Sequence, residues 1–178
     1  RNPLAPHRKV EEWLAASGLA WTFLRPSFFF QSRSTTHRAE IRDRREIFVP
    51  AGDGRTAFVD TRDVAGVAHL ALTEPGHEGQ AYTLTGSEAM TYGEVAVVLS
   101  DVLGRPIRYA RPSPWAFWRR QRAAGTPAGF AAVMLALYTV CRLGLAGGVT
   151  DSLSRLLGRP PRSLRDFAAD YRDAWIVP

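Results

Sequence analysis

Lysine is almost absent from this chain: Lys9 is the only one among its 23 basic residues, and arginine supplies the others. The arginines are spread over nearly every segment, although the formal net charge is +6. A protein that binds nucleic acid usually gathers positive charge on one face and carries a recognisable binding motif. The sequence shows neither feature, so we expect no nucleic-acid partner.

Cysteine is as scarce as lysine, with Cys141 alone. A single thiol forms no internal disulfide, and its apolar neighbours predict a buried, unreactive side chain of the kind found in the reducing cytoplasm. No secretory signal is recognisable, and we expect a cytoplasmic protein. Because the chain starts with Arg1 and a helical pattern follows almost at once, we also expect it to be a piece of a longer protein.

Long apolar runs are missing too. Between Ala128 and Val149 the only charge is Arg142, but glycines interrupt the segment. About 14 apolar residues remain uninterrupted, whereas a transmembrane helix needs roughly 20. We therefore predict a buried helix here and no membrane partner.

Several enzyme signatures are absent: the phosphate loop G-x-x-x-x-G-K, the nucleophile elbow G-x-S-x-G and the glycine-rich turn that holds a dinucleotide. Asp60 and Asp63 could act as a carboxylate pair, but Asp63 stands directly before an apolar helical segment and is more typical of a helix cap. No histidine has a partner at the spacing of metal ligands, so we expect no metal site. The histidines are His7, His37, His69 and His77.

The composition, with 46% hydrophobic and 22% charged residues over 178 positions, fits one globular domain with a sizeable core. Expected strands and helices alternate over residues 1–85, and helices dominate over residues 86–178. This order predicts an α/β fold, in which a parallel sheet continues into a mostly helical cap. Since no linker separates the two regions, we expect one integrated unit.

The first expected helix places Val10 and Trp13 on one face and ends at Gly18, which readily adopts the left-handed cap conformation. A buried strand over residues 19–24 follows and stops at Pro26. A helix is expected from Thr61 or Asp63 to Pro75, and further helices over 92–103, 114–124, 128–143, 150–157 and 163–175. Capping boxes are expected at Thr91 with Glu94 and at Ser163 with Asp166. Further strands are expected over 56–59, 81–84 and 107–110.

Short motifs run through most of the chain in a fixed order: His7-x-x-x-Glu11, TFLRPSFFFQ, PAGDG, FVDTRDVA, YTLTG, LGRP and GRPPRSLRDFA. In this order they closely resemble the C-terminal portion of the NmrA-like family of atypical short-chain dehydrogenases/reductases, including its quinone-reductase-like members. The resemblance implies a Rossmann-type NAD(P)-binding fold, with NADP favoured as the cofactor. Residues 1–85 would then be the C-terminal part of the NAD(P)-binding domain, and residues 86–178 the helical substrate-side cap.

The resemblance also assigns candidate site residues. The family's L-R-P-x-x-F segment passes over the nicotinamide, which implies cofactor contacts for Pro26, Ser27 and Phe28. Ligands of such folds collect at the carboxyl ends of parallel strands, and Pro26 lies at such an end. The next residues would face the substrate pocket, although at least one of three consecutive phenylalanines is expected to pack in the core. The substrate-pocket candidates are Phe29, Phe30, Gln31, Trp115 and Trp118.

His7 and Glu11 stand where catalytic members of the superfamily would have a tyrosine and a lysine, four residues apart on one helical face. Standard carbonyl reduction with a tyrosine donor is therefore not supported. His7 could donate a proton near neutral pH, or it could form an exposed pair with Glu11. We take His7 as the candidate catalytic residue.

Two functions compete. In the first, the protein is an NAD(P)H-dependent oxidoreductase that reduces a quinone-like or other small apolar acceptor. In the second, it is a regulatory sensor that binds NAD(P) without turnover and acts through a protein partner; the missing tyrosine and lysine favour this alternative. Either protein could form a homodimer.

We predict that this chain by itself does not bind NADPH with low micromolar affinity. Pyrophosphate binding in Rossmann proteins uses backbone amides of a glycine-rich turn between a strand and a helix, and no segment here predicts such a turn. Titration of the purified chain with NADPH, followed by nicotinamide fluorescence, measures the affinity. A dissociation constant of about 1–10 µM would reveal a binding site that the sequence does not predict.

Overall fold

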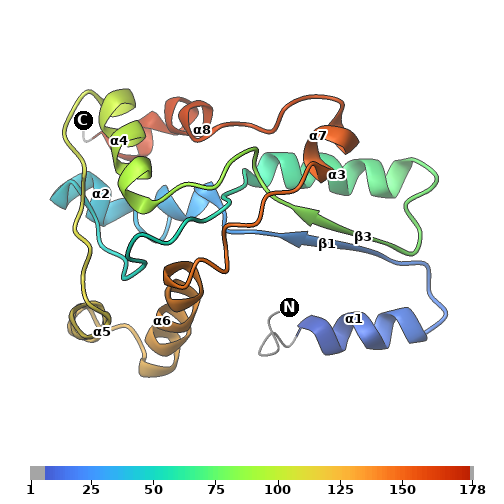
Figure 1. The fold of residues 1–178 in the computed structure, drawn as a ribbon, viewed down its shortest axis with the longest axis horizontal. Coiled ribbons are helices and arrows are strands. Elements are labelled where there is room, and N and C mark those ends of the chain that lie inside the picture. The colour runs from blue at the N-terminus through green and yellow to red at the C-terminus, as the bar shows by residue number, and fades with distance from the viewer. Residues whose placement is uncertain (1–6, 177–178) are drawn as a thin grey trace.

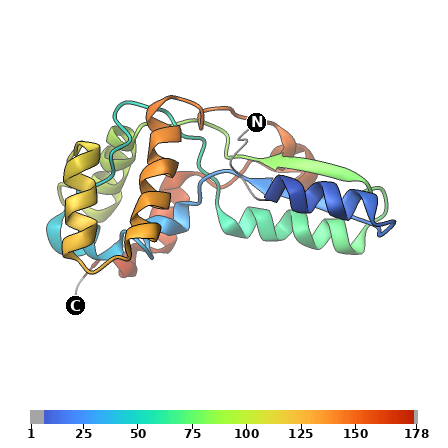
Figure 2. The same cartoon turned by 90° about the horizontal axis from the view of Figure 1, so that it is seen from below.

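The computed structural model describes residues 7–176. Two groups of elements lie side by side along the molecule (Figure 1 and Figure 2). The group that we call the sheet lobe consists of α1 His7–Ala16, β1 Thr22–Pro26, α3 Thr61–Thr73, β3 Gln80–Leu84 and α7 Ser152–Leu157. The helical lobe consists of the short helix η1 Phe30–Arg33, α2 Arg38–Arg44, β2 Glu46–Ile47, α4 Tyr92–Leu103, β4 Arg108–Tyr109, α5 Pro114–Ala123, α6 Ala128–Arg142, α8 Leu164–Asp170 and η2 Arg172–Ala174.

The two longer strands, β1 and β3, pair in parallel, with Thr22 opposite Gln80 and Pro26 opposite Leu84. Their carboxyl ends therefore lie at the same edge. Helices α3 and α7 cover one side of this pair, and α1 lies on the other side (Figure 1). A shorter parallel pair joins β2 and β4 in the helical lobe. The arrangement confirms the predicted α/β class.

The structure corrects the position and the burial of the first strand. Strand β1 covers Thr22–Pro26 instead of residues 19–24, and none of its residues is fully buried. Its side chains alternate between two faces, as in any strand. Leu24 packs into the core below α3, whereas Trp21 and Phe23 line the space next to α1 and stack with ring centroids 4.1 Å apart. The apolar run predicted the strand but not its register with β3.

Helix α1 forms as predicted and is followed by Gly18, whose φ of +78° is the left-handed cap conformation. Its apolar face is not covered, however, because Val10 is 46% and Trp13 71% exposed. The helix contributes no buried residue. It stands away from β1 and leaves a hollow between the two elements.

Helix α3 is capped by Asp60, and the prediction of Thr61 or Asp63 as its cap is wrong. The Asp60 backbone is extended, as an N-cap requires, and its carboxylate accepts the Arg62 N–H at 2.9 Å. Burial alone would raise the pKa of Asp60, but hydrogen bonds from Arg62 and Gln31 outweigh this effect and hold the pKa below its ordinary value. The cap is therefore an ionised carboxylate.

Asp63 lies within the first turn of α3 and is completely buried. Its carboxylate accepts hydrogen bonds from the Arg159 guanidinium and from the Arg162 backbone, each at 2.7 Å. The Arg162 guanidinium forms a second ion pair with the same carboxylate. Asp63 thus ties the segment between α7 and α8 to the start of α3, and it does not form a catalytic pair with Asp60.

Two hydrophobic clusters form the core. The cluster of the sheet lobe includes Val59, Leu84 and Leu153. The larger cluster of the helical lobe includes residues from both halves of the sequence, among them Phe30 and Leu99. Each cluster therefore draws residues from both sides of position 85, as expected of one integrated unit, and the domain boundary at that position stays a prediction.

The predicted capping boxes are confirmed: Thr91 pairs with Glu94 at the start of α4, and Ser163 with Asp166 at the start of α8. The last predicted helix, over 163–175, is shorter than expected. It divides into α8 and the single-turn η2.

The predicted strand over residues 56–59 does not form. Two isolated bridges replace it, one between Phe29 and Val59 in parallel and one between Thr56 and Met90 in antiparallel orientation. Because the segment changes its partner within a few residues, a continuous ladder cannot develop.

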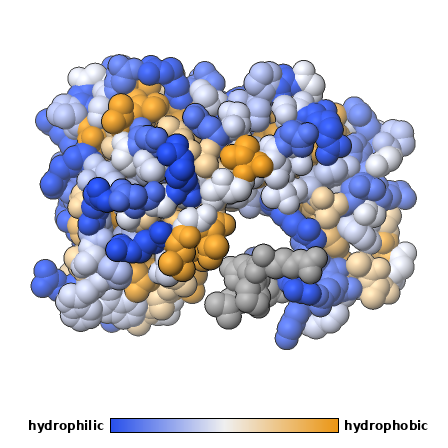
Figure 3. Space-filling model, viewed as in Figure 1, coloured by the Kyte–Doolittle hydropathy of each residue, from blue (hydrophilic) through white to orange (hydrophobic). Residues whose placement is uncertain are grey.

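Helix α6 buries one face only, although the sequence predicts a buried helix. The buried face includes Met134, Tyr138 and Cys141, and the predicted burial of the Cys141 thiol is confirmed. The opposite face is apolar and exposed, with Val133 56% and Leu137 46% accessible. Hydrophobic side chains gather near the middle of the surface that Figure 3 shows. Within residues 7–176, no helix has the length and apolar character needed to cross a membrane.

Replacing Asp63 by asparagine is expected to lower the free energy of unfolding by about 2 kcal/mol, because a buried carboxylate loses its charge-assisted hydrogen bonds to two partly exposed arginines. Urea denaturation of Asp63→Asn and the wild type measures the difference. Asp101→Asn is the matched control, since Asp101 pairs with Arg165 on the surface, where both side chains are more than 60% exposed. Asp101→Asn should lower the free energy of unfolding by less than about 1 kcal/mol. Equal losses in the two variants would contradict the role given to Asp63.

His37 predicts a pH dependence of stability. Its imidazole is buried, with Nε2 2.5 Å from the Tyr138 hydroxyl and Nδ1 3.2 Å from Glu40. Burial lowers the pKa of His37, although Glu40 acts in the opposite direction. Below about pH 6.5 the unfolded chain binds a proton that the buried imidazole does not bind. The free energy of unfolding therefore decreases as the pH is lowered, by up to about 1.4 kcal/mol per pH unit. In His37→Gln this part of the slope should vanish from denaturation curves measured between pH 7 and 5; parallel slopes in both proteins would exclude His37 as the cause.

Candidate active site

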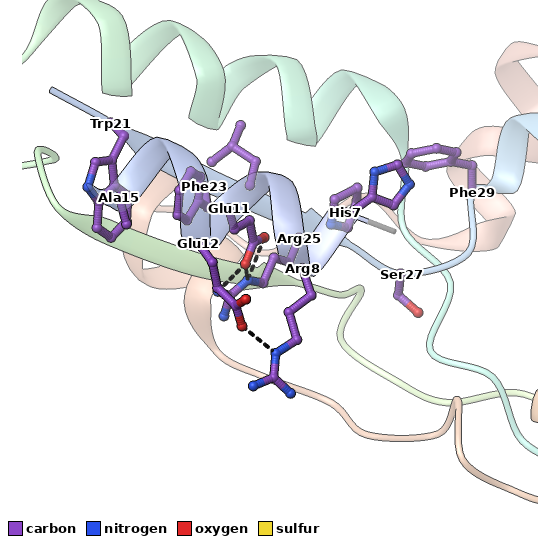
Figure 4. A pocket seen from close by; sticks show the side chains of 12 residues that line it. His7, Arg8, Glu11, Glu12, Ala15, Trp21, Phe23, Arg25, Ser27 and Phe29 are labelled. Carbon is purple, nitrogen blue, oxygen red and sulfur yellow. Dashed lines mark hydrogen bonds and ion pairs between the residues drawn. The ribbon is translucent and has the colours of Figure 1, made fainter. Parts of the chain in front are cut away.

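A hollow of about 860 Å³ lies between α1 and β1 and reaches the carboxyl end of β1 (Figure 4). Its volume is within the range of small-molecule sites. Both elements contribute side chains, and the segment that follows β1 closes one end. The lining residues are His7, Arg8, Glu11, Glu12, Ala15, Trp21, Phe23, Leu24, Arg25, Pro26, Ser27 and Phe29.

Glu11 binds Arg25 across the hollow. The Arg25 guanidinium donates to the two Glu11 oxygens at 2.6 and 3.0 Å in a bidentate pair. The hydrogen bonds from Arg25 lower the pKa of Glu11 although burial acts against them, so the carboxylate stays ionised. The pairing of His7 with Glu11, which the sequence left open, is therefore replaced by a pair between the helix and the strand.

His7 is exposed at the start of α1 and lines the hollow. Figure 4 shows its ring and that of Phe29 at the end of the hollow away from Trp21. The charged side chains of the wall neutralise one another, since Arg8 pairs with Glu12 at 2.8 Å. His7 thus brings to this wall an imidazole, the side chain that most often transfers protons in enzymes.

The three residues proposed to contact the cofactor continue the line of β1. Pro26 is the exposed last residue of the strand, and the Ser27 N–H donates to the Leu84 carbonyl at 2.9 Å. Both line the hollow. Phe28 lies outside the lining and packs against the core of the helical lobe, because successive side chains of an extended segment point in opposite directions.

The residues proposed for the substrate pocket lie in different surroundings. Phe29 lines the hollow and is 37% exposed. Phe30 is buried and stacks between Phe58 and Phe167, with centroid distances of 5.9 and 5.6 Å. It is the core member that the run of three phenylalanines predicts.

Gln31 is held at the start of α3. Its Nε2 donates to Asp60 Oδ1 at 2.9 Å, and its Oε1 accepts the Thr61 N–H at 3.1 Å. Trp115 and Trp118 are on α5 and do not line the hollow, and Trp115 is 68% exposed. A substrate role for these three residues stays a prediction.

Sequence reasoning missed the strand side of the hollow. Trp21, Phe23 and Arg25 occupy alternate positions, so they share one face of the extended chain. That alternation is visible in the sequence, but interpreting the run as a strand buried on both faces concealed it. No group of three or more His, Cys, Asp or Glu side chains is arranged for a metal within residues 7–176.

No family model matches the chain. Two curated proteins are each 38% identical to it: an NAD(P)H azoreductase of Xenophilus azovorans over 165 residues, and a (4-alkanoyl-5-oxo-2,5-dihydrofuran-3-yl)methyl phosphate reductase of Streptomyces griseus over 168 residues. The matches cover 93% and 94% of this chain but only 57% and 59% of those proteins. The chain thus spans less than two thirds of their length.

Solved structures share the fold. An NADPH-dependent quinone oxidoreductase of Escherichia coli, in complex with NADPH, superposes with a TM-score of 0.83 at 27% identity, over 92% of this chain and 58% of that one. A triphenylmethane reductase of Citrobacter sp. with NADP(H) gives 0.85 at 25%, over 96% and 61%. The negative transcriptional regulator NmrA with NAD gives 0.67 at 18%, over 93% and 56%, which shows the fold alone.

The structural neighbours and the sequence relatives are thus NAD(P)-binding reductases of the NmrA-like kind that the motifs resemble. The hollow runs along β1 and reaches its carboxyl end, the edge at which ligands of open α/β sheets bind. The Rossmann-type class implied by the motifs is therefore confirmed.

Proposed function

We propose that the protein carrying this chain is an NAD(P)H-dependent oxidoreductase that reduces a quinone-like or other small apolar acceptor. The observation that carries the proposal is that His7, Pro26, Ser27 and Phe29 line the same hollow, which reaches the carboxyl end of β1. The relatives support it, since they are named as reductases of azo compounds, quinones and triphenylmethane dyes.

The hollow fits the nicotinamide end of the cofactor. Pro26 and Phe29 supply apolar surface for a flat ring, and the half-buried Ser27 offers a hydroxyl beside it. The cofactor, when bound, supplies the hydride. Glycine-rich amides for its pyrophosphate are not found between a strand and a helix within residues 7–176, so this chain would hold the ring and not the phosphates.

His7 would complete the reduction. A two-electron reduction of a quinone adds one hydride and one proton, and it leaves oxidised cofactor and a hydroquinone. The proton would pass from the His7 imidazolium to the acceptor oxygen, and exposure of His7 lets it take up a new proton from water. Glu11 does not serve as the donor, because Arg25 holds it as a carboxylate.

The cofactor preference and the location of the protein are proposed as well. NADP is favoured because the quinone oxidoreductase and the triphenylmethane reductase bind NADPH or NADP(H) in their structures. A cytoplasmic location agrees with the free thiol of Cys141. A homodimer or a protein partner stays a prediction from the sequence.

The test is NADPH oxidation by the protein carrying this chain, measured against a panel of quinones and azo dyes. We expect turnover, and we expect His7→Ala to lower kcat about 100-fold with little change in cofactor affinity, because proton transfer acts in the chemical step. His69→Ala is the matched control, since His69 is an exposed histidine of α3 outside the hollow.

Two results would contradict the proposal in different ways. Tight NADPH binding without turnover on any acceptor would favour the regulatory sensor. Turnover that is equal in His7→Ala and His69→Ala between pH 5 and 9 would keep the oxidoreductase and remove His7 from its mechanism.

A further inference from the structure

A second hollow, of about 780 Å³, lies where the turn after β2 meets the carboxyl end of α6. Its walls combine glycine-rich backbone with long cationic side chains. We name it the arginine hollow. Its lining residues are Gly52, Asp53, Gly54, Arg55, Arg111, Arg142, Leu143, Gly144 and Gly147.

The arginine hollow carries an excess of positive charge. Three guanidinium groups face one lining carboxylate, Asp53, which pairs with Arg111. Arg55 pairs with Glu94 at 3.1 Å, outside the lining. Within residues 7–176, Arg142 forms no ion pair and no side-chain hydrogen bond. Its cation is therefore available to a ligand.

The backbone around Arg142 is packed too closely to be an ordinary surface loop. A Cβ atom on Gly54 would lie 1.7 Å from the Cys141 carbonyl oxygen, so the turn rests directly on the last turn of α6. A Cβ on Gly52 would lie 3.4 Å from Arg142 Cγ. This distance is an ordinary van der Waals contact, so the turn packs along the Arg142 side chain.

Arg111 adds a strained backbone to the same place. Its φ of +46° is in the left-handed region, which residues other than glycine rarely adopt. In this conformation its guanidinium reaches Asp53 in the hollow. Such strain often marks a binding site, because the surrounding structure must hold it in place.

We propose that the arginine hollow binds a phosphate-type oxyanion, independently of the NAD(P)H site. Guanidinium groups bind tetrahedral oxyanions through paired N–H donors. The competing Asp53–Arg111 pair costs little to exchange, because both of its side chains are more than half exposed. The carbonyl end of α6 opposes an anion, but its effect amounts to about half a charge, which is less than the full charge of Arg142.

The anion can be free phosphate or the phosphate of an organic ester. Leu143 lines the hollow and is 67% exposed, and Leu145 nearby in the chain is 73% exposed. Strongly hydrophilic and strongly hydrophobic side chains lie next to each other near the upper end of α6 (Figure 3). An aryl phosphate could contact both kinds of surface, whereas inorganic phosphate could contact the hydrophilic side chains alone. Comparing the affinities of the two compounds therefore distinguishes an organic ester from the free anion.

Calorimetric titration of the protein with inorganic phosphate and with phenyl phosphate, at low ionic strength, tests the proposal. We expect saturable binding at one site, weakened at least about tenfold in Arg142→Gln by loss of a charge-assisted contact. Arg119→Gln, which removes an exposed arginine of α5 outside the hollow, should change the affinity less than about twofold. Phenyl phosphate binding about tenfold more tightly than phosphate would indicate an organic ester; equal affinities would indicate the free anion.

Asp53→Asn provides a test that misfolding cannot imitate. Removing the competing carboxylate frees Arg111, so phosphate should bind several-fold more tightly than in the wild type. The proposal is overturned if neither anion binds, if Arg142→Gln and Arg119→Gln lose affinity equally, or if Asp53→Asn gives no gain.

Discussion

The first turn of α3 is the point on which the rest of the structure depends. Asp60 and Asp63 lie side by side there as buried carboxylates, and each is held by arginines. A buried carboxylate is stable only when its partners replace the lost water. Arg62 holds Asp60 from within the same turn, whereas the arginines that hold Asp63 come from a distant part of the chain. Arg162 brings the C-terminal region to α3 by binding Asp63, and Arg62 extends the contact to Asp170 at 2.6 Å.

The same turn determines the shape of the candidate active site. Gln31 binds both Asp60 and the Thr61 N–H, so the segment after β1 is fixed at its far end. Backbone bonds from Phe30 N–H to the Val59 carbonyl and from Val59 N–H to the Phe28 carbonyl fix its middle. These bonds hold the segment against the start of α3. As a result, Phe30 is buried in the core and Phe29 lines the hollow.

Local features of this fold could be predicted from the sequence, because they depend on neighbouring residues. The capping boxes at Thr91 and Ser163 and the glycine after α1 need only a few adjacent positions. The end of β1 near Pro26 followed from the same kind of signal. These elements were enough to indicate the α/β class and the edge at which the site lies.

The failures have a common cause, which is pairing between distant segments. Nothing near Asp63 in the sequence shows that Arg159 and Arg162 will neutralise it, so its role as a cap was a reasonable error. Arg25 likewise binds Glu11 only because α1 folds back along β1. The sequence supplied the residue types of the site, but the charges that hold them in place follow from the tertiary arrangement.

The segment from Ser27 to His37 joins the two lobes and is anchored in both. It begins in the hollow of the sheet lobe, where the Ser27 N–H extends the ladder of β1 and β3. It ends among buried groups of the helical lobe, where Trp175 Nε1–H donates to the Arg33 carbonyl at 2.9 Å and His37 contacts the Tyr138 hydroxyl. A segment fixed at both ends and in its middle has little freedom to close over a ligand. Selection of an acceptor in this hollow would therefore depend on the side chains that line it, Phe29 above all, rather than on movement of a loop.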